Sequence, residues 1–432
     1  MNVADSEVVA SILKRNGYIY TPDKKNADII LVNTCSIREN AEQRVRGRIR
    51  GFSEIKKKYP GLLIAVMGCM AERLGDKLFE QEKNVNIVVG PDAYNDLPRL
   101  IKEAEIRGQA INIELSEEET YANVCPERIE TSSISGFVSI MRGCNNFCSY
   151  CIVPYTRGRE RSRNPQSIIS EVLSLTAQGY KEITLLGQNV NSYLWRGENK
   201  DLDFPALLDL VAGTFPRIRI RFATSHPKDM SDALLYTMAK YPNICKHIHL
   251  PVQSGSNSVL KNMNRKYTKE WYMECIETIK RILPDCGIST DLFAGFHNES
   301  EEDFRETLEL MKNVGFDLAY MFKYSERPGT AAYRQMPDNV DEKVKGRRLT
   351  EMIELQGRLS MESNRRDIGK VFEVLVEGIS KKNETEMYGR SSQNKVVVFP
   401  AEGIKTGTYV NVRIKDCTSA TLIGEMLKTP ES

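Results

Sequence analysis

Three cysteines stand close together near the middle of the chain, in the segment Arg142-Gly-Cys144-Asn-Asn-Phe-Cys148-Ser-Tyr-Cys151. Their spacing is C-x3-C-x2-C, which 10 cysteines in 432 residues would produce by chance only about 0.005 times per chain. Zinc sites favour C-x2-C units with a second Cys or His pair in reach, and none follows here. Three thiolates on one short loop instead favour a cubane iron–sulfur cluster, with one iron left open for a substrate or cofactor.

Two further cysteines directly follow predicted strands. Cys35 comes after the apolar run 28–33, and Cys69 comes after the apolar run 62–67. Runs of this length and composition predict buried strands. Open α/β sheets bind ligands at the edge where parallel strands end, so neighbouring strands would bring the two thiols together. Position alone leaves two interpretations open, metal ligands or small buried hydrophobic residues.

The first third of the chain alternates helix and strand patterns. Strands are predicted at 28–33, 62–67 and 86–89, with helices before, between and after them, including a basic helix over 38–58. This alternation predicts a doubly wound parallel sheet. Such a domain is expected to open on a strand, whereas this sequence opens on a helix. We therefore expect one strand, and a third cysteine ligand, to precede Met1.

The central third continues the alternation, after residues 107–135, which are predicted to be a linker. Helices at 166–178, 229–240, 269–282 and 301–313 separate the candidate strands 137–141, 182–187, 217–224, 247–252, 288–295 and 318–324. Six such units predict an open (βα)6 barrel whose function lies on the loops after the strands. Polar residues gather at these strand ends: Gln188, Asn189, Ser225, His226, Gln253, Ser254 and Asn298.

The last third changes from helix to short strands. Residues 336–367 predict a charged helix, and the strands that follow are expected at 371–376, 385–389, 395–399, 409–414 and 420–425. Short strands separated mostly by glycine turns predict a small five-stranded β-barrel. From Lys370 onward the sequence has 9 basic and 8 acidic residues, so this barrel carries no basic field.

Overall composition is that of a globular protein. Lys plus Arg is 60 and Asp plus Glu is 58, and 41% of the residues are hydrophobic. No apolar run is long enough to span a membrane. The first residues, MNVADSEVV, carry acids where a secretory signal needs basic residues and an apolar segment. We therefore expect no membrane association, a cytoplasmic location and cysteines kept as thiols.

Positive charge is local. The segment 38–58 has 8 basic and 3 acidic residues, and the segment 142–163 has 5 basic and 1 acidic. Taken alone, the first is interpreted as a solvated helix face. The second flanks the cysteine loop and is interpreted as a phosphate-binding segment. Its candidate RNA-binding residues are Arg157, Arg159, Arg161 and Arg163.

Together, these motifs resemble the radical S-adenosylmethionine superfamily and, within it, the methylthiotransferase family. The resemblance spans essentially the whole chain, and its members that act on isopentenyladenosine in tRNA are the most similar. Besides the cysteine loop, it rests on NTCSIRE (33–39), GCMAER (68–73), YTRGRER (155–161), LGQNVN (186–191), LPVQSGS (250–256) and GRSSQNK (389–395). One departure is GFHN (295–298), where relatives have a Gly-Phe-Pro-Gly turn. We expect it to alter the shape of the loop more than the chemistry.

The resemblance implies a role for each candidate site residue. Cys144, Cys148 and Cys151 would hold a [4Fe-4S] cluster whose open iron chelates S-adenosylmethionine, and Tyr150 would pack near the adenine. Gln188, Asn189 and Gln253 match positions near this cofactor; the alternative is that they are polar strand-end residues without a special role.

The resemblance also implies an auxiliary [4Fe-4S] cluster that supplies sulfur. Cys35 and Cys69 match two of its three ligands. The first ligand belongs to a Gly-Cys-x-Met-Asn motif, and this sequence begins at the corresponding Met1-Asn2 pair. The auxiliary cluster would therefore lack this ligand in the chain as given.

Three domains and a transferase activity follow from the same resemblance. They are a methylthiotransferase N-terminal domain (1–115), a radical barrel (130–365) and a TRAM RNA-binding domain (368–430). The expected reaction adds a methylthio group at carbon 2 of N6-isopentenyladenosine beside the anticodon of tRNA. An electron donor of the flavodoxin or ferredoxin type and a monomeric state are also expected.

Three alternatives stay open. Near relatives act on threonylcarbamoyl-adenosine in tRNA or on a ribosomal-protein aspartate, although the segments 33–38 and 187–189 favour the isopentenyl substrate. A different class is a tRNA-binding iron–sulfur protein that transfers no sulfur.

Overall fold

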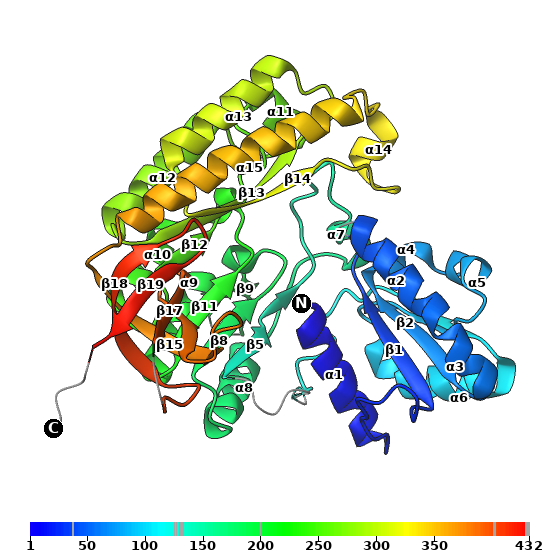
Figure 1. Ribbon diagram of the computed structural model, residues 1–432. Helices are drawn as coiled ribbons and strands as arrows, with labels where there is room; N and C mark the ends of the chain where they lie inside the picture. Colours follow the sequence, from blue (N-terminus) through cyan, green and yellow to red (C-terminus); the bar gives the residue numbers. More distant parts are fainter. Residues whose placement is uncertain are drawn as a thin grey trace. The chain divides into compact units, whose positions relative to one another are not determined.

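The computed structural model describes residues 1–36, 39–124, 126, 128, 134–198, 200–400 and 403–427 (Figure 1). Arg38 of the basic segment and Cys125 of the predicted linker lie outside these residues. The chain falls into two compact units. The first comprises Met1–Ser132, Phe137–Glu171 and Ser325–Gln335, and the second comprises Ser133–Gly136, Val172–Tyr324 and Met336–Ser432.

The first unit contains a four-stranded parallel sheet in the order β1-β2-β3-β4. Every residue of β2 is buried, as expected for a strand covered on both faces. The register of β1 on β2 runs from Ile29 opposite Leu63 to Thr34 opposite Gly68. The strands are β1 (Ile29–Thr34), β2 (Leu63–Gly68), β3 (Ile87–Val89) and β4 (Ala110–Asn112).

Helices cover both faces of this sheet (Figure 1). Val8 and Ile12 of α1 pack with Leu100 of α6 in one core cluster. Ile49 of α2 packs with Leu78 of α5 in the cluster on the other face. The helices are α1 (Asn2–Arg15), α2 (Glu39–Gly51), α3 (Ser53–Lys58), α4 (Cys69–Leu74), α5 (Lys77–Gln81) and α6 (Leu97–Arg107). The predicted doubly wound domain is confirmed.

The segment predicted to be a linker is partly built into the first unit. Residues 110–112 form β4, which pairs with β3. Tyr121 is buried, its ring stacks on Tyr94 at 5.6 Å, and its hydroxyl donates to the carbonyl of Pro91 at 2.8 Å. The linker interpretation was therefore wrong for residues 110–124. The sequence did not reveal this structure, because a three-residue strand and a single buried tyrosine show too little hydrophobic periodicity to be detected.

Short elements surround the cysteine loop in the first unit. β6 (Met141–Arg142) pairs antiparallel with β7 (Arg161–Ser162), and α7 (Val153–Thr156) lies between them in sequence. α14 (Ala331–Gln335) returns to this unit, and its Ala332 N–H donates to the Ser149 carbonyl at 2.7 Å. The loop is therefore fixed at both of its ends and in its middle.

The second unit holds the strands of the predicted barrel. They form two three-stranded sheets, β11-β8-β5 and β12-β13-β14, and a parallel bridge from Ile220 to Ile244 links β11 to the segment just before β12. β5 enters this unit with Ser135 and Gly136. The strands are β5 (Ser135–Ser139), β8 (Glu182–Leu186), β11 (Arg219–Ala223), β12 (His247–His249), β13 (Gly287–Ala294) and β14 (Leu318–Lys323), with a small hairpin of β9 (Leu194–Trp195) and β10 (Leu202–Asp203).

Helices alternate with these strands as predicted. Side-chain caps start several of them, including a capping box between Ser300 and Asp303 at the start of α13. The helices are α8 (Pro165–Ala177), which begins in the first unit, α9 (Phe204–Thr214), α10 (Asp232–Lys240), α11 (Asn257–Asn262), α12 (Lys269–Ile282), α13 (Glu301–Val314) and α15 (Glu342–Arg365). The parallel pairs of β8 with β11, β12 with β13 and β13 with β14, together with the intervening helices, confirm the open barrel.

The C-terminal strands close into a barrel of order β15-β16-β17-β19-β18. Val374, Val397, Phe399, Val412 and Leu422 fill its core. The strands are β15 (Val371–Ile379), β16 (Glu386–Arg390), β17 (Val396–Pro400), β18 (Tyr409–Cys417) and β19 (Leu422–Met426). The predicted five-stranded barrel is confirmed.

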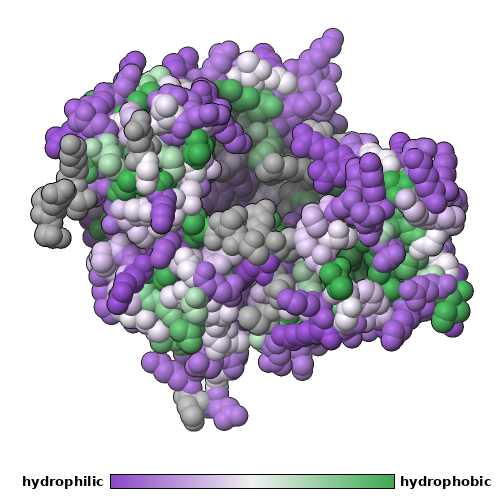
Figure 2. Space-filling model, turned by 60° about the horizontal axis from the view of Figure 1, so that its bottom comes forward, coloured by the Kyte–Doolittle hydropathy of each residue, from purple (hydrophilic) through white to green (hydrophobic). Residues whose placement is uncertain are grey.

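Hydrophilic residues cover most of the face drawn in Figure 2, and hydrophobic ones form small separate patches. No helix among the described residues is both long and apolar enough to cross a bilayer.

Candidate functional site

The cysteine loop leaves β6 through Gly143, whose φ is +77°. A Cβ at this position would lie 1.9 Å from the carbonyl oxygen of Arg159, so only glycine allows the two segments to approach. The Cys144 N–H donates to the Gly158 carbonyl at 3.2 Å, and the Cys151 N–H donates to the Cys148 carbonyl at 2.9 Å. These bonds fold three cysteines into one compact loop.

The three thiols have the chemistry that an iron–sulfur cluster requires. Cys144 and Cys148 are buried, Cys151 is half-buried, and all three are free of disulfides. Burial raises the pKa of the Cys144 thiol to about 11, so a bound cation is what would favour its thiolate form. Within the described part of the chain, no group of three or more His, Cys, Asp or Glu side chains is already gathered as a metal site. Three thiols on one loop match the donor chemistry of an iron–sulfur cluster.

Cys35 and Cys69 lie at one edge of the first sheet, as predicted. Thr34 and Gly68 are register partners at the ends of β1 and β2, and each cysteine is the next residue. Cys69 is buried and begins α4, whereas Cys35 is half-buried. The register confirms their predicted position at one sheet edge, whereas an approach of the two thiols and their role as metal ligands stay predictions.

Arg157 connects Cys69 to a buried carboxylate. Its Nε donates to the Cys69 Sγ at 3.3 Å, and its Nη2 donates to the Asp5 Oδ2 at 2.6 Å. Arg142 donates from Nη1 to the other Asp5 oxygen at 3.0 Å. Burial alone would raise the pKa of Asp5, but the charges of Arg157 and Arg142 outweigh burial and lower it. Asp5 is therefore an ionised carboxylate between two guanidinium groups.

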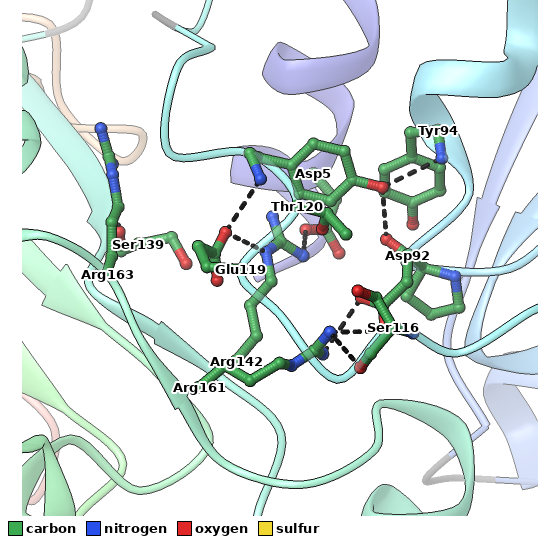
Figure 3. A network of polar contacts seen from close by, with 12 residues as sticks. Asp5, Asp92, Tyr94, Ser116, Glu119, Thr120, Ser139, Arg142, Arg161 and Arg163 are labelled. Atoms are coloured by element: carbon green, nitrogen blue, oxygen red, sulfur yellow. Dashed lines mark hydrogen bonds and ion pairs between the residues drawn. The ribbon is translucent and has the colours of Figure 1, made fainter. Parts of the chain in front are cut away.

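Arg161 is held in the same network, which Figure 3 shows from close by. It contacts both carboxylate oxygens of Asp92, at 2.8 and 3.1 Å, and donates to the Ser116 carbonyl at 2.8 Å. Arg163 pairs with Glu171 and donates to the Ser139 carbonyl at 3.2 Å.

Three of the four arginines predicted to bind RNA lie in buried ion pairs. Arg157, Arg161 and Arg163 are each at most 6% exposed. They pair with carboxylates of the first unit, and their RNA-binding role stays a prediction. The sequence showed a run of basic residues but not the distant acids, such as Asp5 and Asp92, that pair with them. Arg159 alone is exposed, and its guanidinium lies 4.8 Å from the ring centre of Phe147.

Two acidic residues near the cysteine edge were missed. Asp5 could have been detected, because it lies on the buried face of α1 one turn before Val8 and Val9. Glu72 follows Cys69 in α4, and a Cβ on Gly90 would lie 2.0 Å from the Glu72 Oε2. Burial, and to a smaller degree the charge of Asp92, raises the pKa of Glu72 to about 8.

In the second unit, Gln188 and Asn189 follow β8, beside the end of β11. Leu186 and Ala223 are register partners, and the Val190 N–H donates to the Thr224 carbonyl at 2.9 Å. The buried oxygens Gln188 Oε1, Asn189 Oδ1 and Ser225 Oγ have no hydrogen-bond partner among the described residues. Buried polar atoms are normally satisfied, so this strand edge fits a ligand that donates hydrogen bonds.

Gln253 lies in the other sheet of the second unit, in a backbone conformation with φ +75°. Its N–H donates to the Asp291 carbonyl at 2.9 Å, and its own carbonyl accepts from the Phe293 N–H at 3.0 Å. The backbone is thereby fixed at the start of the loop after β12. Tyr150 is half-buried in the cysteine loop of the first unit.

Three protein families match separate parts of the chain. Residues 1–90 match the Uncharacterized protein family UPF0004, residues 138–311 match the Radical SAM superfamily, and residues 365–427 match the TRAM domain. A solved radical S-adenosylmethionine methyltransferase, TsrM of Kitasatospora setae with cobalamin and a [4Fe-4S] cluster, shares the fold. Its TM-score is 0.58 at 13% identity, over 76% of this chain and 73% of that one.

Curated relatives match nearly the full chain. The tRNA-2-methylthio-N(6)-dimethylallyladenosine synthase of Bacteroides fragilis is 59% identical over 98% of this chain and 93% of that protein. The synthase of Porphyromonas gingivalis is 56% identical over 100% of this chain and 94% of that protein. The chain therefore belongs to the radical S-adenosylmethionine superfamily and, within it, to the family of the tRNA-2-methylthio-N(6)-dimethylallyladenosine synthases.

Proposed function

We propose that this chain transfers a methylthio group to carbon 2 of N6-isopentenyladenosine, beside the anticodon of tRNA. The observation that carries the proposal is the identity of 59% with a synthase of that name over 93% of its length. The cysteine loop, which forms no disulfide, and the unsatisfied strand-end oxygens support it, because they provide a metal donor set and a polar ligand site.

The cluster and S-adenosylmethionine, when bound, supply the radical chemistry that opens an unactivated C–H bond. The chain binds and orients them. Cys144, Cys148 and Cys151 provide the thiolates, and Tyr150 packs near the adenine. Gln188, Asn189 and Gln253 would contact the cofactor, and the oxygens of Gln188 and Asn189 that lack a partner among the described residues would accept its hydrogen bonds.

Cys35 and Cys69 would provide two ligands of an auxiliary cluster, which would supply the sulfur. The Arg157 Nε already donates to the Cys69 Sγ, and hydrogen bonds to ligand sulfurs are a recognised means of tuning such clusters. Arg157 is thus a positioning residue for this ligand.

RNA binding is assigned to the TRAM domain (368–430) and to Arg159. The domain limits 1–115 and 130–365, an electron donor of the flavodoxin or ferredoxin type, a monomeric state and a cytoplasmic location remain predictions of the same proposal.

The decisive experiment is anaerobic reconstitution with iron and sulfide, followed by incubation with S-adenosylmethionine and tRNA that carries isopentenyladenosine. Mass spectrometry of the nucleosides should show the 2-methylthio product. Cys148→Ala should abolish it, whereas Cys417→Ala, at a half-buried cysteine of β18, should retain it. A wild-type protein that is loaded with iron yet yields no product would refute the proposal.

Iron content tests the auxiliary cluster separately. About eight irons per chain indicate two clusters, and about four indicate the cluster of Cys144, Cys148 and Cys151 alone. Cys69→Ala should lower a content of about eight to about four, whereas an unchanged content would remove Cys69 from the ligand set.

A further inference from the structure

Two arginines and two aromatic rings form a continuous patch in the first unit. The Arg159 guanidinium lies 4.8 Å from the centre of the Phe147 ring, and this ring meets Tyr155 edge-on at 6.2 Å. On the far side, the Arg334 guanidinium lies 5.8 Å from the Tyr155 ring centre, and its Nη2 donates to the Tyr155 hydroxyl at 3.4 Å. We call these four residues the aromatic–arginine patch.

The patch is exposed and preformed. Tyr155 is 39% exposed, and Arg159 and Arg334 are exposed as well. Phe147 comes from the cysteine loop, Tyr155 from α7, Arg159 from the segment between α7 and β7, and Arg334 from α14. The bond from the Ala332 N–H to the Ser149 carbonyl, at 2.7 Å, ties α14 to the loop. A partner would therefore meet a surface whose side chains need little ordering.

The charges of this patch are uncompensated. Within the described residues, neither Arg159 nor Arg334 has a carboxylate partner, unlike Arg157 and Arg161, which pair with Asp5 and Asp92. Two guanidinium groups over aromatic rings offer positive charge and flat stacking surfaces together. Phosphates bind the first, and unpaired bases stack on the second.

We propose that the aromatic–arginine patch binds unpaired nucleotides of the RNA substrate beside the cysteine loop. This inference rests on the proposed function, because it assumes an RNA substrate. An acidic protein would also be drawn to two arginines, but the exposed tyrosine between them favours a partner with stacking bases. The C-terminal barrel has 9 basic and 8 acidic residues from Lys370 onward, so it offers no competing basic field.

The test measures affinity for an anticodon stem-loop by fluorescence anisotropy, with iron content and circular dichroism as checks of folding. Tyr155→Ala should weaken binding about tenfold through lost stacking, whereas Tyr155→Phe should stay within about twofold. Arg159→Gln and Arg334→Gln should each reduce the slope of log affinity against log salt by about one.

Matched controls change equivalent residues elsewhere. Tyr236→Ala, at a tyrosine 57% exposed on α10, and Arg305→Gln, at an exposed arginine of α13, should leave affinity and salt slope unchanged. Wild-type affinity in the folded Tyr155→Ala and arginine variants would overturn the proposal.

The alternative partner gives a distinct result. The arginine variants could bind RNA normally but be reduced more slowly than the wild type by a flavodoxin, while dithionite reduces them at the wild-type rate. In that case the patch binds an acidic protein and the RNA proposal is wrong. Failure of the proposed function is separable: a wild-type protein that forms no methylthio product while its patch variants lose RNA affinity would refute the reaction but not the patch.

Discussion

Asp5 is the residue on which the buried network of the first unit depends. It is fully buried and accepts hydrogen bonds from Arg142 at 3.0 Å and Arg157 at 2.6 Å. A buried ion pair contributes little net stability, but removal of one partner is costly because it leaves a buried charge without compensation. Here Asp5 pairs with two guanidinium groups. Arg157 also contacts Cys69, and Arg142 has a longer second pair with Glu119 at 3.7 Å.

Asp5→Asn should therefore lower the stability of the first unit by about 3–5 kcal/mol. Asp96→Asn is the control, because Asp96 pairs with Arg99 on the surface and should cost at most about 1 kcal/mol. Thermal unfolding at neutral pH distinguishes the two. Equal melting temperatures for the two variants would show that Asp5 does not carry the network.

Acid should act through the same carboxylate. The pKa of folded Asp5 is lower than its ordinary value of 3.8, so its stabilising effect is fully present above pH 3.8 and is lost as pH falls through the folded value. Wild-type melting temperatures should fall over this range more steeply than those of Asp5→Asn. Parallel curves would contradict the assignment.

Glu72 should have the opposite pH dependence. Its pKa is raised from 4.5 to about 8, so its stabilising contribution is complete below pH 4.5 and is lost as pH rises toward 8. Glu72→Gln should remove this loss and gain about 1–2 kcal/mol at pH 8, a value reduced for partial solvent exposure. Urea unfolding at pH 5 and pH 8 measures the difference, and an equal gain at both would refute it.

The residues of the site were only partly predictable from sequence. Spacing identified Cys144, Cys148 and Cys151, and strand-end position placed Cys35 beside Cys69. Spacing could not show that Arg157, Arg161 and Arg163 turn inward, because their acidic partners lie up to 152 positions away in sequence. Burial and ion pairing depend on the tertiary structure, so the sequence of a basic segment does not show whether its side chains face solvent or the interior.

The cysteine loop as an element depends on its glycine. Gly143→Ala would place a Cβ 1.9 Å from the Arg159 carbonyl, at a φ of +77°. The Arg159 backbone cannot move aside as a flexible side chain could, so the cysteine loop should open and lose its cluster. Iron analysis should then show about four irons fewer per chain.

Gly179→Ala is the matched control, because Gly179 has a φ of +91° but nothing within 4 Å of the added Cβ. It should incur the backbone strain and retain the iron. If both variants keep a full complement of iron, close approach at Gly143 is not required for cluster binding.

Most elements were predictable because their periodicity is strong. The apolar strand β2 and the amphipathic helix α12 were predicted within one residue of their observed limits. The basic segment 38–58 was predicted as one helix but divides into α2 and α3 at Phe52, directly after Gly51, a residue type that commonly ends helices. The GFHN turn keeps a positive φ at Gly295, and His297 is buried between the Pro337 carbonyl and the Tyr324 hydroxyl.

At the scale of the molecule, the GRSSQNK segment attaches the C-terminal barrel to the barrel strands within the second unit. Arg221 of β11 donates to the Ser391 carbonyl at 2.8 Å and to the Glu182 carboxylate at 2.7 Å. Lys395 contacts Asp367 at 2.6 Å. The GRSSQNK segment therefore has a structural role, whereas the sequence showed it only as a motif shared with the family.

Arg221→Met should loosen this attachment, because it leaves Glu182 buried without its partner. Limited proteolysis between residues 366 and 370 should become faster and release the C-terminal barrel. Arg413→Met, at an exposed arginine of β18, is the control and should be cleaved at the wild-type rate. Identical rates for both variants would assign the attachment to other contacts.

The composition of the first unit has a consequence for exchanging parts between homologous enzymes. Residues 1–124 are joined to the cysteine loop region by Asp5 with Arg142 and Arg157, and by Asp92 with Arg161. A chimera cut at the apparent domain boundary near residue 115 would separate these charges and also divide the Ser116 N–H from the Asp92 carboxylate to which it donates. The transplantable module is therefore discontinuous, and a functional swap must carry residues 137–171 together with the N-terminal sheet.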